Sequence, residues 1–225
     1  GGEHFFWFSW HFGGYDRAKH DAGISHYIPV NLGEIPDYYR RFNPPIDVAI
    51  IKARPMDENG YFNFGGSHLW HRTVVERAKV VIVEVNDKLP YVYGDQTGIH
   101  RGEVDYIIEG NDLPPAELPN PPPSDVDQAV GRLIAEQIEN GSCLRIGIGG
   151  MPNAVCSLLQ HSDVRDLGIH TEMLTDGIID LYKAGRITGV KKTIDKGKSV
   201  YTFALGSKHL YDTIDRNPDF HNCPV

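Results

Sequence analysis

The proline-rich segment at residues 114–123 (PPAELPNPPP) constrains the fold more than any other part of the sequence, because six of its ten residues are proline. Proline fixes φ and has no backbone N–H, so neither a helix nor a central strand can run through this segment. We therefore expect an extended linker, with one compact part of the chain on each side. The predicted boundaries are residues 1–118 for the first part, 119–123 for the linker and 124–225 for the second part.

The composition indicates a globular chain and excludes several other classes. Hydrophobic residues make up 40 % of the 225 positions and the net charge is −8, which excludes a disordered chain and argues against nucleic-acid binding. No stretch reaches the roughly 18 apolar residues of a membrane-spanning helix, so no membrane contact is expected. The three cysteines form no CxxC pair, so we expect no disulfide framework and no structural zinc site, and a reducing compartment.

The first part of the chain is predicted to consist mostly of strands. The runs at 47–53 (DVAIIKA) and 79–85 (KVVIVEV) are continuously apolar, which is typical of strands that are buried on both faces. Between them, Asn-Gly within 57–60 predicts a turn, and residues 67–78 a helix. A further short strand is expected at 104–108.

The second part alternates strands and helices. Ser124 is a favourable N-cap, and the helix that follows is expected to end at Asn140-Gly141. Its apolar face would be formed by residues at helical spacing, namely Val126, Val130, Leu133, Ile134 and Ile138.

Further strands are expected at 143–148, 167–171 and 199–205, with helices after Pro152 and over 207–215. Strand–helix–strand units at this spacing imply right-handed crossovers and a parallel sheet. The predicted fold class is therefore α/β, with open, mostly parallel sheets.

The loop Gly147-Ile148-Gly149-Gly150 is the strongest local signal for chemistry. It joins a predicted strand to a helix, and glycines there let a ligand approach backbone N–H groups at a helix N-terminus. The segment is not the dinucleotide fingerprint, because Pro152 occupies the third glycine position. A phosphate- or oxyanion-binding loop and a simple tight turn remain open from the residues alone.

Glu172 is the candidate reactive side chain. It is expected at or just past the C-terminal end of its strand, the edge at which ligands bind in parallel sheets. There it could converge with the amides of Gly147–Met151, although from spacing alone an ion-pairing or capping role is the commoner one for a lone glutamate at such a position. His68, His71, His100 and His170 show no third ligand at metal spacing, so no metal site is expected.

A basic stretch at residues 183–198 carries six basic residues and one acidic residue. It would attract a polyphosphate, but a solvated surface loop is the simpler interpretation. No GxSxG motif occurs, which argues against a serine hydrolase of the nucleophile-elbow type.

Together, the motifs resemble the class I CoA-transferases of the acetyl-CoA hydrolase/transferase family, and within it the butyryl-CoA:acetate and 4-hydroxybutyrate CoA-transferases. The resemblance spans nearly the whole chain. It is specific because many segments agree in order: SHYIPVNLGEIP (25–36), DVAIIKARPMDENGYFNFG (47–65), AKVVIVEVN (78–86), NDKLPYVYG (86–94), VDYIIEG (104–110), DVDQAVGRLIAEQIENG (125–141), GIGGMPNAV (147–155) and LGIHTEM (167–173).

The resemblance implies two related α/β domains with the active site between them. It implies that Glu172 is the covalent nucleophile and that Gly147, Ile148, Gly149, Gly150 and Met151 contact coenzyme A. It further implies ping-pong transfer of coenzyme A as a substrate, with no tightly bound cofactor, in a cytoplasmic homo-oligomer.

Proteins of this family are about twice as long, so the chain is expected to be an internal piece: the later part of the first domain, the linker and the first part of the second. Two alternative functions stay open. An acyl-CoA hydrolase would use water in place of the acceptor acid, and a non-catalytic CoA- or nucleotide-binding module would form no covalent adduct.

Overall fold

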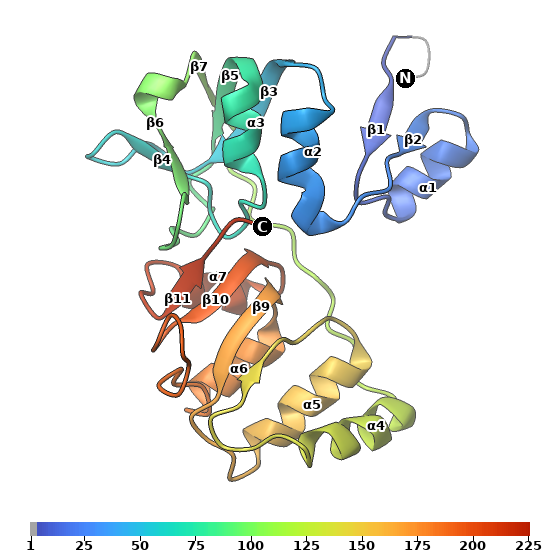
Figure 1. Ribbon diagram of the computed structural model, residues 1–225, viewed down its shortest axis with the longest axis vertical. Coiled ribbons are helices and arrows are strands. Elements are labelled where there is room, and N and C mark those ends of the chain that lie inside the picture. Colours follow the sequence, from blue (N-terminus) through green and yellow to red (C-terminus); the bar gives the residue numbers. More distant parts are fainter. Residues whose placement is uncertain (1–3) are drawn as a thin grey trace. The chain divides into compact units, whose positions relative to one another are not determined.

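The computed structural model describes residues 4–225 and divides the chain after Pro44 into two compact units, Gly1–Pro44 and Pro45–Val225. Figure 1 shows the helices and strands of each unit. Residues 110–124 contain neither helix nor strand, in keeping with their proline content. The predicted domain boundaries at 118 and 124 remain predictions. No helix among the described residues is long and apolar enough to cross a membrane.

The first unit is small and rich in aromatic side chains. Strands β1 (Trp7–Ser9) and β2 (Ser25–Tyr27) pair in parallel, and helix α1 (Gly14–Asp21) connects them. The short helix η1 (Leu32–Glu34) and helix α2 (Ile35–Arg41) follow.

The second unit begins with a parallel sheet of order β3-β5-β7, formed by Ile46–Ala53, Ala78–Val85 and Tyr106–Glu109. An antiparallel pair, β4 (Tyr61–Asn63) and β6 (Gly98–His100), and helix α3 (His71–Arg77) complete this region with the turn η2 (Arg101–Glu103). Its core contains buried side chains from all of these strands except β7: Ile51, Ala53, Phe62, Phe64, Val75, Val81, Val83, Ile99 and Val104.

The prediction that both long strands are buried on two faces is wrong for the described residues. Alternate residues such as Ile51 and Val83 are buried, whereas Val48 is 49 % and Ile50 67 % exposed. Strand periodicity places these residues on opposite faces, so one face of β3 is covered and the other is open, whereas Val80 and Ile82 at the corresponding positions of β5 are half-buried.

Two further predictions in this region need correction. The expected helix at 67–78 is shorter, because Ser67 pairs with Phe203 of another strand and Ala78 already begins β5. The expected strand at 104–108 starts later, at Tyr106, because Val104 closes the η2 turn by donating to Arg101 O. In the first case pairing with other strands overrides local propensity, and in the second the local η2 turn delays the strand.

A second parallel sheet has the order β11-β10-β9-β8, which confirms the predicted α/β class. Its strands are Phe220–Asn222, Ser199–Ala204, Gly168–Leu174 and Cys143–Leu144. Helices α5 (Gly150–Gln160), α6 (Asp176–Lys183) and α7 (Lys208–Ile214) connect consecutive strands, and α4 (Asp125–Ala135) packs on α5 (Figure 1). The sequence analysis missed α6.

Helix α4 confirms the predicted N-cap and corrects the predicted face. Ser124 Oγ accepts from Asp127 N at 3.2 Å, and the Asp127 carboxylate accepts from Ser124 N at 2.9 Å. The helix ends at Ala135, earlier than predicted, because the next amides bond three residues back. Its expected apolar face is largely exposed: Val126 72 %, Leu133 65 % and Val130 40 %.

The helix instead contacts α5 through Gly131, which is buried. A Cβ on this glycine would lie 3.0 Å from Ala154 Cβ, so the absence of a side chain allows the close approach of the two helices. The predicted stripe of larger apolar residues therefore lies to one side of the contact.

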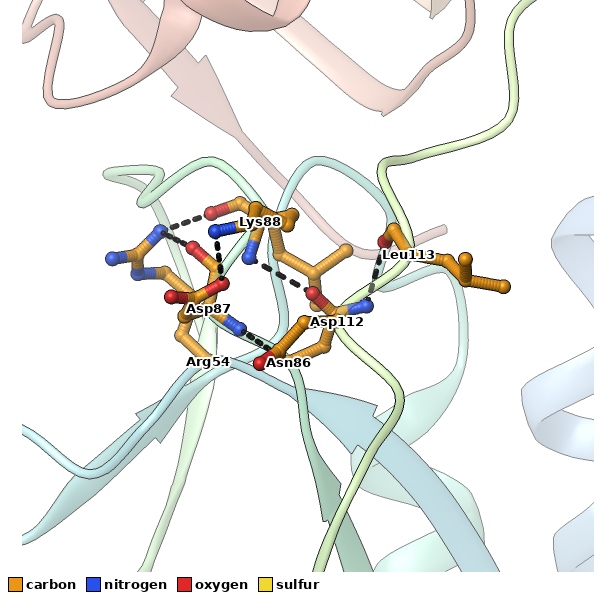
Figure 2. A network of polar contacts seen from close by, with 7 residues as sticks. Arg54, Asn86, Asp87, Lys88, Asp112 and Leu113 are labelled. Carbon is orange, nitrogen blue, oxygen red and sulfur yellow. Dashed lines mark hydrogen bonds and ion pairs between the residues drawn. The ribbon is translucent and has the colours of Figure 1, made fainter.

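The residues that directly precede the proline-rich segment are bound to the first sheet of the second unit by a polar network at the ends of β3 and β5 (Figure 2). Asn86 Nδ2 donates to Leu113 O at 2.9 Å, and Asp87 N donates to Asp112 Oδ1 at 3.0 Å. Arg54 Nη1 donates to Asp87 O at 3.2 Å.

The proline-rich segment itself is hydrogen-bonded to elements of the second sheet and its helices. Tyr211 on α7 donates its hydroxyl to Ala116 O at 2.7 Å, and Leu118 N donates to Gly206 O at 3.1 Å. The segment is thus hydrogen-bonded to the second sheet through Ala116 and Leu118.

Candidate functional site

Glu172 lies within β9, two residues before its end, rather than at or past the end of a strand as predicted. Strand β9 runs to Leu174 because β10 pairs with it up to Ala204. The neighbour on the other side, β8, ends at Leu144 opposite Ile169. Glu172 therefore occupies the part of β9 that extends beyond β8, and its side chain is 41 % exposed.

Arg145 is the partner of Glu172. Its Nη2 lies 2.7 Å from Glu172 Oε2, and among the described residues no other group hydrogen-bonds that carboxylate. Because the Arg145 side chain is 72 % exposed, the pair holds the orientation of the carboxylate while contributing little to stability. Sequence reasoning missed Arg145, although its place two residues before the glycine loop was an available signal.

The chain leaves the sheet after Leu144, and the side chain of Thr171 binds it just beyond that point. Ile146 N donates to Thr171 Oγ1 at 3.3 Å, and the Thr171 hydroxyl donates to Ile146 O at 3.0 Å. These side-chain bonds replace the backbone ladder, so the expected strand 143–148 is reduced to Cys143–Leu144. The glycine loop consequently starts directly beside the residue that precedes Glu172.

The glycine loop has the open, strained backbone that a ligand-binding turn needs. Gly149 has φ +118°, which residues with a side chain rarely adopt, and it forms the N-cap of α5. A Cβ on Gly147 or Gly149 would meet no atom within 4 Å. At Gly150 the Asp127 carboxylate is instead close, since a Cβ there would lie 2.4 Å from Asp127 Oδ2.

A cavity of about 340 Å³ adjoins this loop. It is lined by residues at the C-terminal ends of β9 and β10, by the loop and by the proline-rich segment: Leu118, Pro119, Asn120, Pro121, Ile148, Gly149, Asn153, Thr175, Asp176, Leu205 and Gly206. Clefts outside the carboxyl ends of parallel strands are the usual ligand sites in such sheets.

The predicted loop residues therefore have different positions. Ile148 and Gly149 line the cavity, whereas Met151 belongs to α5 and packs against the core. Gly147 is exposed and Gly150 half-buried.

Three of the four histidines and the basic stretch lie elsewhere, whereas His170 is on β9, two residues before Glu172. His68 and His71 lie inside the part of the second unit that contains the β3-β5-β7 sheet. His100 caps η2 by accepting a hydrogen bond from Gly102 N. Within the basic stretch, Lys192 is buried, and its Nζ donates to Ile169 O at 2.9 Å and to Lys198 O at 2.8 Å. That stretch is therefore partly a structural element rather than a wholly solvated loop.

Comparison with known proteins identifies relatives of this arrangement. Residues 4–119 match the family model described as acetyl-CoA hydrolase/transferase N-terminal domain. The chain is 47 % identical to a butyryl-CoA:acetate CoA-transferase of Anaerostipes caccae, over 99 % of the chain and 50 % of that relative. It thus spans about half the length of the curated relatives it matches.

Solved structures of two proteins have a similar fold. RipA from Yersinia pestis superposes with a TM-score of 0.89 at 34 % identity, over 97 % of this chain and 51 % of that one. A 4-hydroxybutyrate CoA-transferase from Porphyromonas gingivalis superposes with a TM-score of 0.83 at 36 % identity, over 96 % of this chain and 55 % of that one.

Proposed function

Because the chain belongs to the acetyl-CoA hydrolase/transferase family, we propose that the protein transfers coenzyme A from a short-chain acyl-CoA to a carboxylic acid such as acetate. Butyryl-CoA and 4-hydroxybutyryl-CoA are the proposed donor classes. The observation that carries the proposal is the half-exposed Glu172 carboxylate, held by Arg145 beside an open glycine loop.

The proposed reaction proceeds through Glu172 in two exchanges. A carboxylate oxygen of Glu172 attacks the thioester carbonyl carbon and the C–S bond breaks. Coenzyme A departs as its thiolate, and the acyl group and Glu172 are joined as a mixed anhydride. The thiolate then attacks the glutamyl carbonyl carbon of that anhydride, the original acyl group departs as a free carboxylate, and a glutamyl-CoA thioester remains. An acceptor carboxylate takes coenzyme A by the reverse sequence, with no change of oxidation state.

The surroundings of Glu172 support this chemistry. The Glu172 carboxylate is partly exposed and therefore reachable by a substrate, and its contact with the Arg145 guanidinium fixes its orientation. Each tetrahedral intermediate carries an oxyanion, which exposed backbone N–H groups of the glycine loop can stabilise by about 3 kcal/mol per donor. The cavity beside the glycine loop, whose lining includes neither Glu172 nor Arg145, offers space for part of the acyl-CoA.

The proposal includes coenzyme A as substrate rather than as a bound cofactor, a homo-oligomeric assembly and a cytoplasmic location. It assigns contacts with coenzyme A to Gly147, Ile148, Gly149, Gly150 and Met151. Of these, Ile148 and Gly149 have the better structural support because they line the cavity.

The test is intact-protein mass spectrometry on the natural protein that carries these residues, in its full length. The protein is mixed with butyryl-CoA without acceptor and then treated with borohydride. We expect a coenzyme A adduct, or its reduction product, that maps to residue 172 and is absent from Glu172→Gln.

Glu84→Gln is the matched control, because Glu84 is also a strand glutamate in an ion pair, 3.1 Å from Lys52 Nζ. It should form the adduct normally. An adduct that persists in Glu172→Gln would refute the nucleophile assignment. Consumption of acyl-CoA without acceptor and without adduct would favour a hydrolase that does not use Glu172, and binding without either would favour a non-catalytic module.

A further inference from the structure

Three side chains of different chemistry meet at the edge strand β11, away from the residues discussed above. His221 lies on β11 and Cys223 directly follows it, so strand periodicity places both on the same face. Asp95 approaches from the segment that runs beside this strand. Its backbone N donates to Asn222 O at 2.9 Å, and Asn222 N donates to Tyr93 O at 2.9 Å.

The three side chains present their ligand atoms to a common point. Asp95 Oδ2 lies 3.4 Å from His221 Nε2 and 3.6 Å from Cys223 Sγ. All three ligand atoms lie within 4.8 Å of one another. Ligand atoms around a tetrahedral Zn²⁺, with bonds of 2.0–2.3 Å, lie roughly 3.3–3.8 Å apart. The two separations from Asp95 fall in this range, and the third, between His221 and Cys223, is at most 4.8 Å, so a shift of the side chains by about an ångström or less would complete three corners of such a site.

The backbone that carries these ligands is held by buried groups. His68 is fully buried; its Nε2 donates to Asp95 O at 2.9 Å, and its Nδ1 contacts Asn222 Oδ1. The Asn222 amide in turn donates to Thr202 O at 2.8 Å and to Tyr201 O at 3.2 Å. His68 thus links the segment of Asp95 to the strand of the other two ligands, and such supporting contacts fix the geometry of metal ligands.

The approach of the two segments also depends on Gly94. Its φ is +149°, and a Cβ there would lie 1.9 Å from Asn222 O. Only glycine allows Asp95 to come this close to β11.

The donor set suits a cation. A carboxylate, an imidazole and a thiol, all of them metal-ligating groups, face the same point. The Asp95 side chain is 68 % exposed, which gives an ion and a water molecule access. The nearby Lys192 opposes a cation, but its Nζ is directed at two backbone carbonyls.

We propose that Asp95, His221 and Cys223 bind a divalent transition-metal ion of the Zn²⁺ class, with water as the fourth ligand. On binding, the thiol proton is released to solvent and the metal–sulfur bond forms, without any redox step. A mixed oxygen, nitrogen and sulfur set suits Zn²⁺ better than Mg²⁺ or Ca²⁺. This site does not depend on the proposed transfer reaction, because none of its ligands belongs to the Glu172 site.

Co²⁺ titration of the tag-free, reduced protein tests the proposal, because Co²⁺ replaces Zn²⁺ and reports its ligands optically. We expect one equivalent to bind with a thiolate-to-cobalt charge-transfer band and the visible bands of tetrahedral Co²⁺, both removed by added Zn²⁺. Cys223→Ser should lose the charge-transfer band. The control Cys143→Ser, which removes an exposed free cysteine, should keep it.

Two further variants keep the outcome decisive. His221→Gln and Asp95→Asn should each weaken Co²⁺ binding by at least about tenfold, the lower end of what even supporting residues contribute. Far-ultraviolet circular dichroism verifies that each variant is folded. A band that survives in Cys223→Ser, a band lost in Cys143→Ser, affinity unchanged in His221→Gln, or binding without a charge-transfer band would overturn the proposal.

Discussion

Two buried tyrosines of the second sheet offer a matched test of its hydrogen bonding. Tyr201 on β10 is fully buried, and among the described residues its hydroxyl has no hydrogen-bond partner. Tyr211 on α7 is also buried, but its hydroxyl donates to Ala116 O at 2.7 Å. Removing the two hydroxyls should therefore change the free energy of unfolding in opposite directions.

The magnitudes follow from the two environments. A buried polar group without a partner costs about 1–3 kcal/mol, so Tyr201→Phe should raise the free energy of unfolding by about 1 kcal/mol. Tyr211→Phe loses a bond worth about 0.5–1.5 kcal/mol and should lower it by that amount. In a chain of this size each kcal/mol corresponds to a Tm change of about 2–4 °C.

Urea unfolding followed by circular dichroism measures both effects, with the slope m as the check that the unfolded states remain comparable. The reasoning fails if Tyr201→Phe destabilises the protein as much as Tyr211→Phe does. That result would mean that the Tyr201 hydroxyl is bonded in solution, for example to an internal water molecule.

Other predictions concern pH, backbone conformation and capping. Burial, reinforced by the charge of His68, lowers the pKa of His71 to about 4, below its ordinary value, so the unfolded chain binds more protons between pH 6.5 and 4. The free energy of unfolding should therefore fall as the pH falls through this window, by up to about 3 kcal/mol, and His71→Gln should remove that part of the slope in urea titrations. Gly94→Ala should destabilise the protein by at least about 2 kcal/mol in thermal unfolding, because its Cβ would overlap Asn222 O, whereas Gly33→Ala, which meets no atom within 4 Å, should be nearly neutral. Equal effects of the two would contradict the packing argument. Ser124→Ala should lower the free energy of unfolding by about 1 kcal/mol through loss of the N-cap, and no loss would show that α4 does not depend on its capping box.

The elements that sequence reasoning predicted well are those whose signal is local. The continuous Val and Ile runs of β3 and β5, the N-cap at Ser124 and the alternation that implies a parallel sheet need no knowledge of distant residues. The family resemblance is likewise confirmed, since it rests on many short segments in a fixed order.

The predictions that failed depend on contacts between segments far apart in sequence. Strand β8 ends early because the Thr171 side chain takes over the bonds of Ile146. Strand β9 is longer than expected because β10 extends alongside it, which places Glu172 inside a strand. Arg145 became visible as the partner of Glu172 only in three dimensions. The roles of Glu172 and of the glycine loop remain predictions.

The proline-rich segment gives the cavity beside the glycine loop two unlike walls. Pro119 and Pro121 have no N–H, and the N–H of Leu118 is already bonded to Gly206 O. That wall therefore offers rings and carbonyls but few donors, whereas the opposite wall begins at Gly149, the N-cap of α5, with its unpaired amides. The proline-rich segment therefore makes one side of the cavity apolar and poor in donors, while Asn120, Asn153 and Asp176 add polar side chains to its lining.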